Sequence, residues 1–455
     1  MTCRGNKYQT YKGLILSILD YGCELYDSAT YNLKKQLDSV QYKALKTITG
    51  ALLGTSLDAL QVECGQMPLY LRRKRFIDKT HFYLLSAPDD HPTKEILIGH
   101  PFSQGIEWKK GEGPFFNRIS TLNFEKSEIQ TNLTLKIPFW HLPKPMVYQH
   151  VHERLNKKNN SSSELKEYTL DILQTKYKDH LKVYTDGSKQ EDGSTAAAFF
   201  IPEFDISRSA RMSAISIMKA ELAAIVLALE WLHINLTTTE VVILSDSYSA
   251  LQSLEKENNE CNLVREILHK LQCLKMKRIS VSFEWIPAHV GIHGNEIADT
   301  LAKNATKRKA IDFEIKLSKN DLETKSYKVY LDEWQKDWDT SLKGRFLYNI
   351  QNKVTDNPKF KFNTRNEEIM FHRFRLGVTS LNYKFFEIGL HNDGQCQVCK
   401  VPETIDHYLF TCKRYDRIRN TTLKSLKAPI TVKNLLTNEQ NIKMFLRYLN
   451  KSGRF

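Results

Sequence analysis

Four acidic side chains in this sequence could serve one chemical site, because each lies in a short context of apolar or small residues. They are Asp186, Glu221, Asp246 and Asp299. Carboxylates that converge repel one another unless cations neutralise them, and hard oxygen ligands of this kind suit magnesium. A site that holds two magnesium ions suits the cleavage of phosphodiesters. The residue types therefore indicate metal-dependent phosphodiester chemistry, provided that the fold brings the four acids together.

The patterns around these acids predict the elements that must position them. Alternating and aliphatic runs predict strands, and an apolar period near 3.6 residues predicts helices. We expect strands at 181–186, 195–202, about 205–213, 240–245 and 279–285, and helices at about 216–233, 247–257, 261–276 and 294–305. This order of strands and helices is typical of a mixed α/β layer.

The predicted elements place the acids where they could meet. Asp186 and Asp246 each lie at the end of a strand, so neighbouring strands would bring both carboxylates to one edge of the sheet. Glu221 lies in the first turns of a helix that can aim it at that edge. Asp299 lies on the last helix, four residues after Asn295, so these two share a face. Taken singly, each acid is equally well explained as a cap or a surface residue. The combination favours a site.

The motifs around the four acids resemble those of ribonuclease H, most closely the ribonuclease H domains carried by non-LTR retrotransposons. The motifs are Thr-Asp-Gly-Ser, Lys-Ala-Glu-Leu, Leu-Ser-Asp-Ser and Trp-Ile-Pro-Ala-His-Val-Gly-Ile-His-Gly-Asn-Glu-Ile-Ala-Asp. The resemblance covers about residues 181–305 and all four acidic positions. It implies an α/β fold with a five-stranded mixed sheet and flanking helices, joined here to mainly helical N-terminal and C-terminal regions.

The resemblance also implies a metal site and a reaction. Two magnesium ions, with manganese as an alternative, would be held by Asp186, Glu221, Asp246 and Asp299. In the implied two-metal scheme, one ion activates the attacking water and the other stabilises the leaving 3′ oxygen. The implied activity is endonucleolytic hydrolysis of the RNA strand of an RNA–DNA hybrid, which leaves 5′-phosphate and 3′-hydroxyl ends.

Four further residues match positions of the same family. His289 matches a catalytic histidine on a mobile loop, and a side chain that changes charge near neutral pH suits proton transfer or product release. Gly187 and Ser188 match positions near the hybrid backbone, where glycine allows close approach and the 2′-hydroxyl distinguishes RNA from DNA. Asn295 matches a position that supports the site or contacts nucleic acid. Gly187, Ser188 and Asn295 are the predicted contacts with substrate, and His289 is predicted to be catalytic.

A cysteine–histidine cluster near the C-terminus has the spacing of a zinc site. Cys396, Cys399, His407 and Cys412 follow the pattern C-x2-C-x7-H-x4-C. Three sulfurs and one imidazole complete a tetrahedral shell, so we expect one structural zinc ion. A chance cluster of buried thiols and a redox-active Cys-x-x-Cys pair are the alternatives. Of the eight cysteines, the other five are scattered and do not indicate a disulfide framework.

The charge distribution favours a polyanionic partner. The formal net charge is +14, yet the segment 181–306 is locally acidic, and the flanking segments carry the excess of lysine and arginine. This charge is compatible with nucleic acids as partners, among which the resemblance to ribonuclease H implies an RNA–DNA hybrid, while protein partners stay unknown. No apolar run reaches the roughly 18–20 residues of a membrane-spanning helix, so we expect no membrane association.

Two basic runs have two interpretations each. The run 72–75 is either a solvated helix face or a contact with nucleic acid. The run 371–375 alternates aromatic and basic residues, which either grip phosphate and stack on bases or pack in a core.

The sequence divides into four predicted parts. They are a helical region at 1–87, an irregular connector at 88–180, the ribonuclease H domain at 181–306, and a helical basic tail at 307–455 with the zinc module at 396–412. Parts of the first region resemble the segment after the polymerase palm in retrotransposon polyproteins, and 369–419 resembles the segment after their ribonuclease H domain. The polymerase signature is absent. We therefore expect the C-terminal portion of such a polyprotein, without the polymerase activity or the separate endonuclease activity of the polyprotein.

Two other functions compete with this interpretation. In the first, the protein is a non-catalytic nucleic-acid-binding remnant that uses the basic tail and the zinc module; the intact set of four acids argues against it. In the second, the same fold cuts a DNA strand, for which we expect different residues around Gly187 and Asn295. Without a clear signal peptide we expect an intracellular location. A nuclear location suits a genome-inserting element, but no targeting signal decides it.

Overall fold

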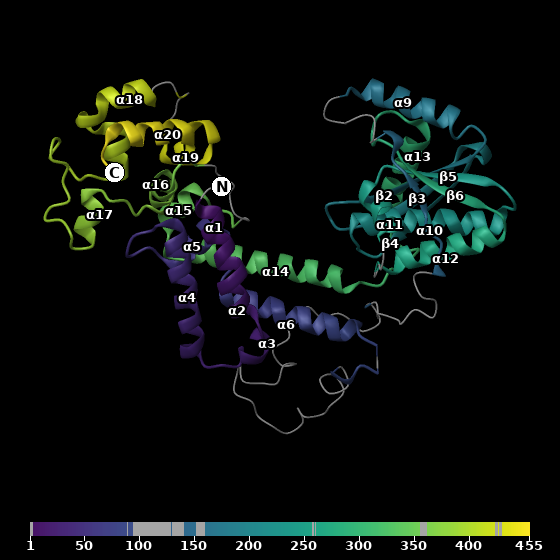
Figure 1. The fold of residues 1–455 in the computed structure, drawn as a ribbon, viewed down its shortest axis with the longest axis horizontal. Coiled ribbons are helices and arrows are strands. Elements are labelled where there is room, and N and C mark those ends of the chain that lie inside the picture. Colours follow the sequence, from purple (N-terminus) through teal and green to yellow (C-terminus); the bar gives the residue numbers. More distant parts are fainter. Residues whose placement is uncertain are drawn as a thin grey trace. The chain divides into compact units, whose positions relative to one another are not determined.

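The computed structural model describes residues 3–88, 90–93, 129, 141–151, 160–256, 259, 261–354, 362–423, 426 and 430–455. Their contacts form two compact units (Figure 1). The described residues of Met1–Phe82 and Glu323–Phe455 form the first unit, and those of Tyr83–Glu95 and Phe124–Leu322 form the second. The boundaries predicted after residues 87, 180 and 306 stay predictions, and much of the predicted connector lies outside the described residues.

A mixed sheet forms the centre of the second unit. Its strand order is β1-β6-β5-β2-β3-β4, in which β3 runs antiparallel to β2 and β4, and the other neighbours are parallel. The strands are β1 (Met146–Tyr148), β2 (Leu181–Lys189), β3 (Thr195–Ile201), β4 (Ile206–Met212), β5 (Glu240–Ser245) and β6 (Ser280–Trp285). The predicted α/β fold with a mixed sheet is confirmed, and all five predicted strands are present.

Beyond the five strands predicted for residues 181–306, the sheet has a sixth strand at its edge. Strand β1 lies in the predicted connector and pairs with β6, with Val147 opposite Phe283. The buried carboxylate of Glu284 secures this edge. It accepts hydrogen bonds from the backbone amide of His150 at 2.9 Å and from the hydroxyl of Tyr177 at 2.8 Å. A strand of three residues is too short to show a period of two, so only its pairing with β6 reveals it.

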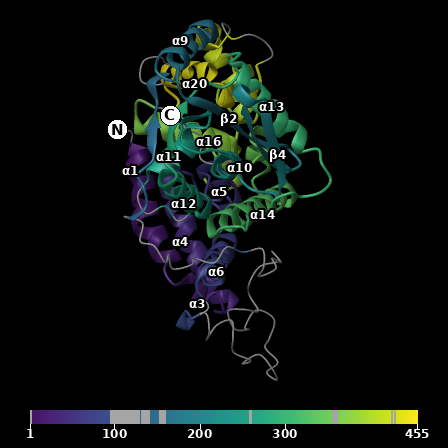
Figure 2. The same ribbon diagram turned by 90° about the vertical axis from the view of Figure 1, so that its right-hand side faces the viewer.

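Helices pack against both faces of this sheet. They are α9 (Ser162–Thr175), α10 (Ile217–Asn235), α11 (Tyr248–Glu255), α12 (Asn262–Met276) and α13 (His293–Ala305), seen from two directions in Figures 1 and 2. Helix α13 packs on Tyr184, because a Cβ atom added to Gly294 would lie 2.3 Å from that ring. Helix α10 packs on Gly187. Since side chains alternate along β2, these two helices lie on opposite faces.

The first unit is helical and draws its core from both ends of the described chain. Leu60 and Trp338, for example, belong to one buried cluster. The elements are α1 (Cys3–Thr10), η1 (Tyr11–Leu16), α2 (Ser17–Asp20), α3 (Cys23–Tyr26), α4 (Tyr31–Thr49), α5 (Leu57–Cys64), α6 (Leu69–Ser86), α14 (Lys319–Thr340), α15 (Arg345–Ile350), α16 (Arg365–Leu376), α17 (Asn382–Glu387), η6 (His407–Thr411), η7 (Lys413–Tyr415), α18 (Asp416–Thr422), α19 (Val432–Thr437) and α20 (Glu439–Ser452); α6 and α14 continue past the boundaries of the unit. No helix in the described ranges is long and apolar enough to cross a membrane.

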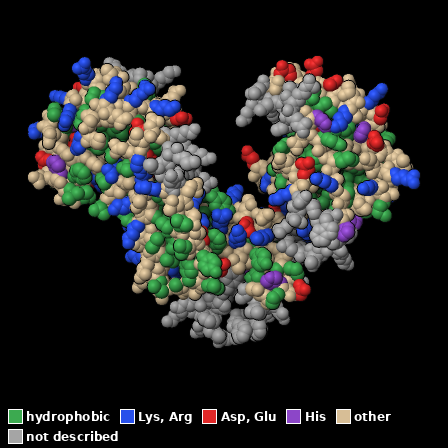
Figure 3. All heavy atoms as spheres, in the orientation of Figure 1, with side chains coloured by type: hydrophobic (Ala, Val, Ile, Leu, Met, Phe, Trp, Pro, Cys, Tyr) green, Lys and Arg blue, Asp and Glu red, His purple; other side chains and the backbone are tan. Residues whose placement is uncertain are grey.

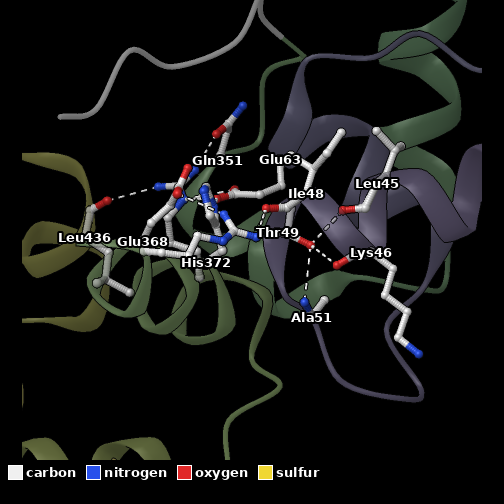
Figure 4. A network of polar contacts seen from close by, with 12 residues as sticks. Leu45, Lys46, Ile48, Thr49, Ala51, Glu63, Gln351, Glu368, His372 and Leu436 are labelled. Carbon is white, nitrogen blue, oxygen red and sulfur yellow. Dashed lines mark hydrogen bonds and ion pairs between the residues drawn. The ribbon is translucent and has the colours of Figure 1, made fainter. Parts of the chain in front are cut away.

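A buried polar network joins α5 to α16 in this unit (Figure 4). The guanidinium of Arg375 donates to both carboxylate oxygens of Glu63, at 3.0 and 2.9 Å, and the ring of His372 bonds to the same carboxylate. Burial disfavours the charged form of Glu63, but the interactions with Arg375 and His372 are stronger than this effect. They hold the pKa of Glu63 below the usual range. Phe371 and Phe374 are buried as well. The basic and aromatic run 371–375 therefore packs in the interior, as its second interpretation states.

Candidate active site

Two neighbouring strands bring the first and third of the predicted acids together. Strands β2 and β5 pair in parallel, with Thr185 opposite Ser245. Asp186 follows Thr185 and Asp246 follows Ser245, so the two carboxylates leave the sheet side by side. Asp186 is only 6% exposed. The Trp285 indole donates a hydrogen bond to the Asp246 carbonyl oxygen at 3.0 Å, which ties this turn to β6.

Helix α10 supplies the second acid, and a glycine lets the helix come close enough. Ser216 caps the helix by accepting a hydrogen bond from the amide of Lys219. One turn later, the Glu221 carboxylate accepts a hydrogen bond from the amide of Gly187 at 3.0 Å. A Cβ atom at Gly187 would lie 2.4 Å from the Glu221 backbone nitrogen. Any larger residue at this position would push the helix, and the Glu221 carboxylate with it, away from β2.

Three of the four predicted acids therefore converge. Carboxylate oxygens of Asp186, Glu221 and Asp246 all lie within 4.8 Å of one another. Burial raises the pKa of Asp186 to about 8, and repulsion from Asp246 and Asp299 adds to the shift. Burial, followed by repulsion from Asp186 and Asp246, also raises the pKa of Glu221 well above its usual range. Full ionisation of this cluster is unfavourable unless a cation is present.

Asp299, on α13, is half-buried and lies near this cluster. It is near enough to Asp186 to contribute to the raised pKa of that residue. Its carboxylate accepts a hydrogen bond from the ammonium group of Lys303, one helical turn away, at 2.7 Å. Ligand atoms of His289, Glu296 and Asp299 lie within 4.8 Å of one another and form a second group. The fourth acid thus links the buried carboxylates to the loop that carries the histidine.

That loop has an unusual backbone. His289 is exposed and has a φ angle of 55°, a left-handed conformation that is uncommon for residues other than glycine. The Gly291 amide donates to the Glu296 carboxylate at 3.3 Å and holds the loop to α13. Strained residues persist where the surrounding structure enforces them, and they cluster at functional sites. His293 is exposed at the start of α13.

The three predicted substrate contacts lie beside the acids but are buried. Gly187 and Ser188 follow Asp186 on β2 and pair with β3. Asn295 is 1% exposed, and its amide donates to the Asp246 carboxylate at 3.2 Å. Its Oδ1 atom has no hydrogen-bond partner in the part of the chain that the structure describes. The position of Asn295 supports the orientation of Asp246 directly.

The cysteine–histidine cluster also comes together, in the first unit. The four predicted ligand atoms of Cys396, Cys399, His407 and Cys412 lie within 4.8 Å of one another. The sulfur of Cys412 is 3.7 Å from that of Cys396 and 3.9 Å from that of Cys399. In a tetrahedral site with ordinary zinc–sulfur bonds, two sulfurs are about 3.8 Å apart. The spacing of the thiols therefore fits zinc.

The histidine of this cluster fits a metal as well. His407 lies on the short π-helix η6, and its Nδ1 atom contacts the Thr411 hydroxyl at 3.2 Å. Its Nε2 atom is buried without a hydrogen-bond partner among the described residues. In metal-binding histidines, one ring nitrogen typically contacts a polar group of the protein while the other binds the metal.

The basic run 72–75 on α6 is neither fully solvated nor free to bind phosphate. Arg72 pairs with Asp20, and Arg73, which is buried, pairs with Asp27 at 2.9 Å. Lys74 pairs with Glu333 and Arg75 lies over the ring of Tyr327. Elsewhere, lysine and arginine side chains are spread over the face shown in Figure 3 rather than gathered in one patch. The run 72–75 therefore does not identify a surface that binds a polyanion.

Sequence reasoning missed two positively charged neighbours of the site. Lys303 follows Asp299 by four residues on one helix, a spacing that places the two side chains together and could have identified the pair. Lys219 forms an ion pair with Asp321, which is 102 residues away in sequence, and no local pattern predicts that contact. The proximity of Glu296 to His289 depends likewise on how the loop folds back.

Comparison with protein families agrees with this geometry. Residues 178–307 match the family model described as RNase H. The matched segment contains the mixed sheet from β2 to β6, the helices from α10 to α13 and all four acids. The match supports a ribonuclease H domain within residues 178–307 of this chain, with binding of nucleic acid and hydrolysis of the RNA strand of RNA–DNA hybrids as the general activity.

Proposed function

We propose that the domain at 181–306 is a functional endoribonuclease that cuts the RNA strand of RNA–DNA hybrids with two magnesium ions, for which manganese can substitute. The observation that carries this proposal is the convergence of Asp186, Glu221 and Asp246 within 4.8 Å in a segment that matches ribonuclease H. Asp299 is proposed as the fourth ligand, because it lies close enough to Asp186 to raise the pKa of that residue.

The residues present fit magnesium. The donor set consists of carboxylate oxygens, which hard divalent cations prefer. Burial and mutual repulsion raise the pKa values of Asp186 and Glu221, so the cluster lacks the positive charge that would let all its members ionise. The Lys303 ammonium offsets only part of this repulsion at Asp186.

When bound, two magnesium ions would lower the pKa of the attacking water and neutralise charge on the leaving oxygen. The side chains and backbone of the protein orient the ligands. The Gly187 amide fixes the Glu221 carboxylate, and the Asn295 amide fixes that of Asp246. We assign proton transfer at the leaving group to His289, which is exposed and next to Asp299. Contacts of Gly187, Ser188 and Asn295 with the hybrid backbone remain part of the proposal.

The proposal includes the parts of the chain outside the nuclease domain. We infer that Cys396, Cys399, His407 and Cys412 hold one structural zinc ion, since their spacing and the free Nε2 atom of His407 fit it. The motifs on either side of the nuclease domain support an origin in a retrotransposon polyprotein. The basic tail would then add affinity for nucleic acid to a domain that is itself acidic.

The test is cleavage of an RNA–DNA hybrid with a labelled RNA strand by the full chain and magnesium. We expect cutting by the wild type, loss of cutting by Asp186→Asn, and normal cutting by Glu191→Gln, which removes an exposed acid of the same domain. Parallel reactions with double-stranded DNA and single-stranded RNA define the substrate.

Each outcome separates the candidate functions. Equal cutting by the wild type and by Asp186→Asn would point to a contaminating nuclease and remove support for the site. Cutting of a DNA strand would favour the hypothesis that the same fold acts as a nuclease on DNA. Hybrid binding without cutting by any variant would favour the nucleic-acid-binding remnant. RNA-strand cutting that only Asp186→Asn abolishes is the result that the proposal requires.

A further inference from the structure

Residues 308–321, which we call the strap, follow α13 and lie along the edge strand β4. The guanidinium of Arg308 donates to the carbonyl and hydroxyl oxygens of Ser209 at 2.7 and 2.6 Å. The backbone amide of Asp312 donates to the carbonyl of Arg211, and the Asp312 carboxylate accepts the amide of Arg211 at 2.9 Å. Strand β4 is the last strand of the sheet, so the strap covers an edge that would otherwise be open.

The strap continues past β4 to the start of the helix that carries Glu221. The amide of Ile315 donates to the Ser213 hydroxyl at 3.1 Å, and this hydroxyl donates to the carbonyl of Ile315 at 3.1 Å. Ser213 lies three residues before Ser216, which caps α10. The strap therefore fixes the connection between the edge strand and the active-site helix.

The last contact of the strap reaches α10 itself. Asp321 forms an ion pair with Lys219. The Asp321 side chain is 12% exposed and the Lys219 side chain is 6% exposed. The same oxygen of Asp321 accepts hydrogen bonds from the Ser318 amide and hydroxyl, at 2.8 and 2.6 Å, which orient the carboxylate. Loss of one partner from a buried pair leaves an uncompensated charge, and the remaining group must move toward water or recruit it.

The position of Lys219 connects this pair to the carboxylate cluster. Lys219 and Glu221 lie in the first two turns of α10, separated by one residue. The helix backbone at Glu221 lies close against Gly187, and the Glu221 carboxylate accepts a hydrogen bond from the Gly187 amide at 3.0 Å. A movement of the Lys219 side chain and its turn would therefore displace the Glu221 carboxylate from the other two acids.

We propose that Asp321, at the end of the strap, is a positioning residue, which holds Glu221 in the carboxylate cluster through Lys219. This inference rests on the proposed hydrolysis of RNA–DNA hybrids. It extends the domain beyond the last residue of the family match, to the end of the compact second unit at Leu322.

The test compares two acids of the strap in the full-length protein. Asp321→Asn removes the ion pair between Asp321 and Lys219 of α10. Asp312→Asn alters the exposed ion pair between Asp312 and Arg308, and both of these residues contact β4. We expect Asp321→Asn to lower kcat for hybrid cleavage by about 10-fold, the lower end of the effect of losing a group that orients a metal ligand, and to raise the magnesium concentration for half-maximal activity. Asp312→Asn should leave both values unchanged.

A second readout does not depend on activity. Amide hydrogen exchange in the first turns of α10 should be faster in Asp321→Asn than in the wild type or Asp312→Asn. Asp321→Glu keeps the charge and should show a smaller effect on both readouts. If Asp321→Asn does not fold, the comparison of Asp321→Glu with Asp312→Glu replaces it.

Equal kcat, magnesium dependence and exchange in the Asp321 and Asp312 variants would overturn the inference. Failure of the wild type to cut the hybrid would instead refute the proposed function. The exchange measurement would still show whether Asp321 positions the first turns of α10, so the two failures can be told apart.

Discussion

At the residue scale, the candidate site holds negative charge in a place that resists ionisation. Asp186 and Glu221 are each 6% exposed, and each has a carboxylate neighbour within 4.8 Å. Structural roles for single acids, such as capping a helix, do not require two buried carboxylates and a half-buried one to face one another. The cluster stores unfavourable electrostatic energy that a bound cation would release, and sites of this kind are commonly functional.

This arrangement predicts how stability depends on pH in the metal-free protein. The folded protein keeps the proton on Asp186 up to about pH 8, whereas the unfolded chain loses it near pH ~4. Between these values unfolding releases a proton, so the contribution of Asp186 to stability is lost as the pH rises through this window. Asp186→Asn cannot ionise, so its melting temperature should rise relative to the wild type as the pH is raised from about 4 to 8.

Thermal unfolding at a series of pH values, with a chelator present, measures this difference. Magnesium should raise the melting temperature of the wild type more than that of Asp186→Asn, because an ion that binds only the folded state stabilises it. A constant difference between the two proteins across the pH range would mean that Asp186 is not held protonated by the fold.

At the element scale, the site depends on how closely helix α10 approaches strand β2. The contact is backbone to backbone, since a Cβ atom on Gly187 would meet the nitrogen and Cα atoms of Glu221 and the carbonyl carbon of Ala220. Such a contact cannot be relieved by rotating a side chain. Packing of α10 against β2 therefore explains why position 187 requires glycine, independently of any contact with substrate.

We therefore expect Gly187→Ala to reduce both stability and activity. Overpacking of this kind costs about 1–3 kcal/mol in the free energy of unfolding. The shift of α10 would also separate Glu221 from Asp186, so hybrid cleavage should fall more than the loss of folded protein explains. Chemical denaturation and cleavage assays measure the two effects. Gly13→Ala, where an added Cβ atom meets nothing within 4 Å, is the matched control. Wild-type behaviour of Gly187→Ala would contradict the packing argument.

At the scale of the whole molecule, each unit assembles segments that are distant in sequence. In the first unit, Glu63 pairs with His372 and Arg375 across 309 and 312 positions. The tail around the thiols has its own buried cluster, in which Cys396 and Cys412 lie with Phe374 of α16. A metal bound by the thiols would therefore connect the 396–412 segment to a core shared with the helices before and after it.

This arrangement predicts a structural role for zinc. The purified protein should contain about one equivalent of zinc, and removal by a chelator or by Cys412→Ser should lower the melting temperature. Cys273→Ser, which alters a thiol outside the cluster, should have no such effect. Metal analysis and thermal unfolding provide the measurements. A metal-free protein with a melting temperature insensitive to chelation would instead favour a cluster of buried thiols.

The sequence by itself determined the features that depend on local chemistry. The short apolar run in 195–201 and the longer apolar segment in 217–235 reveal β3 and α10, because residues buried on most sides are apolar or small at almost every position. The order of the four acids and the C-x2-C-x7-H-x4-C spacing were likewise visible, since ligand types at short separations are constrained by the ion they would hold.

Only the tertiary structure decided the features that depend on distant partners. Strand β1 becomes visible through its pairing with β6, and the run 371–375 becomes part of a core through Glu63. The pair between Lys219 and Asp321 joins residues 102 positions apart. Periodicity and motif spacing report on neighbours along the chain. Which buried charge meets which partner depends on how the whole chain packs, and this information is absent from any single short segment.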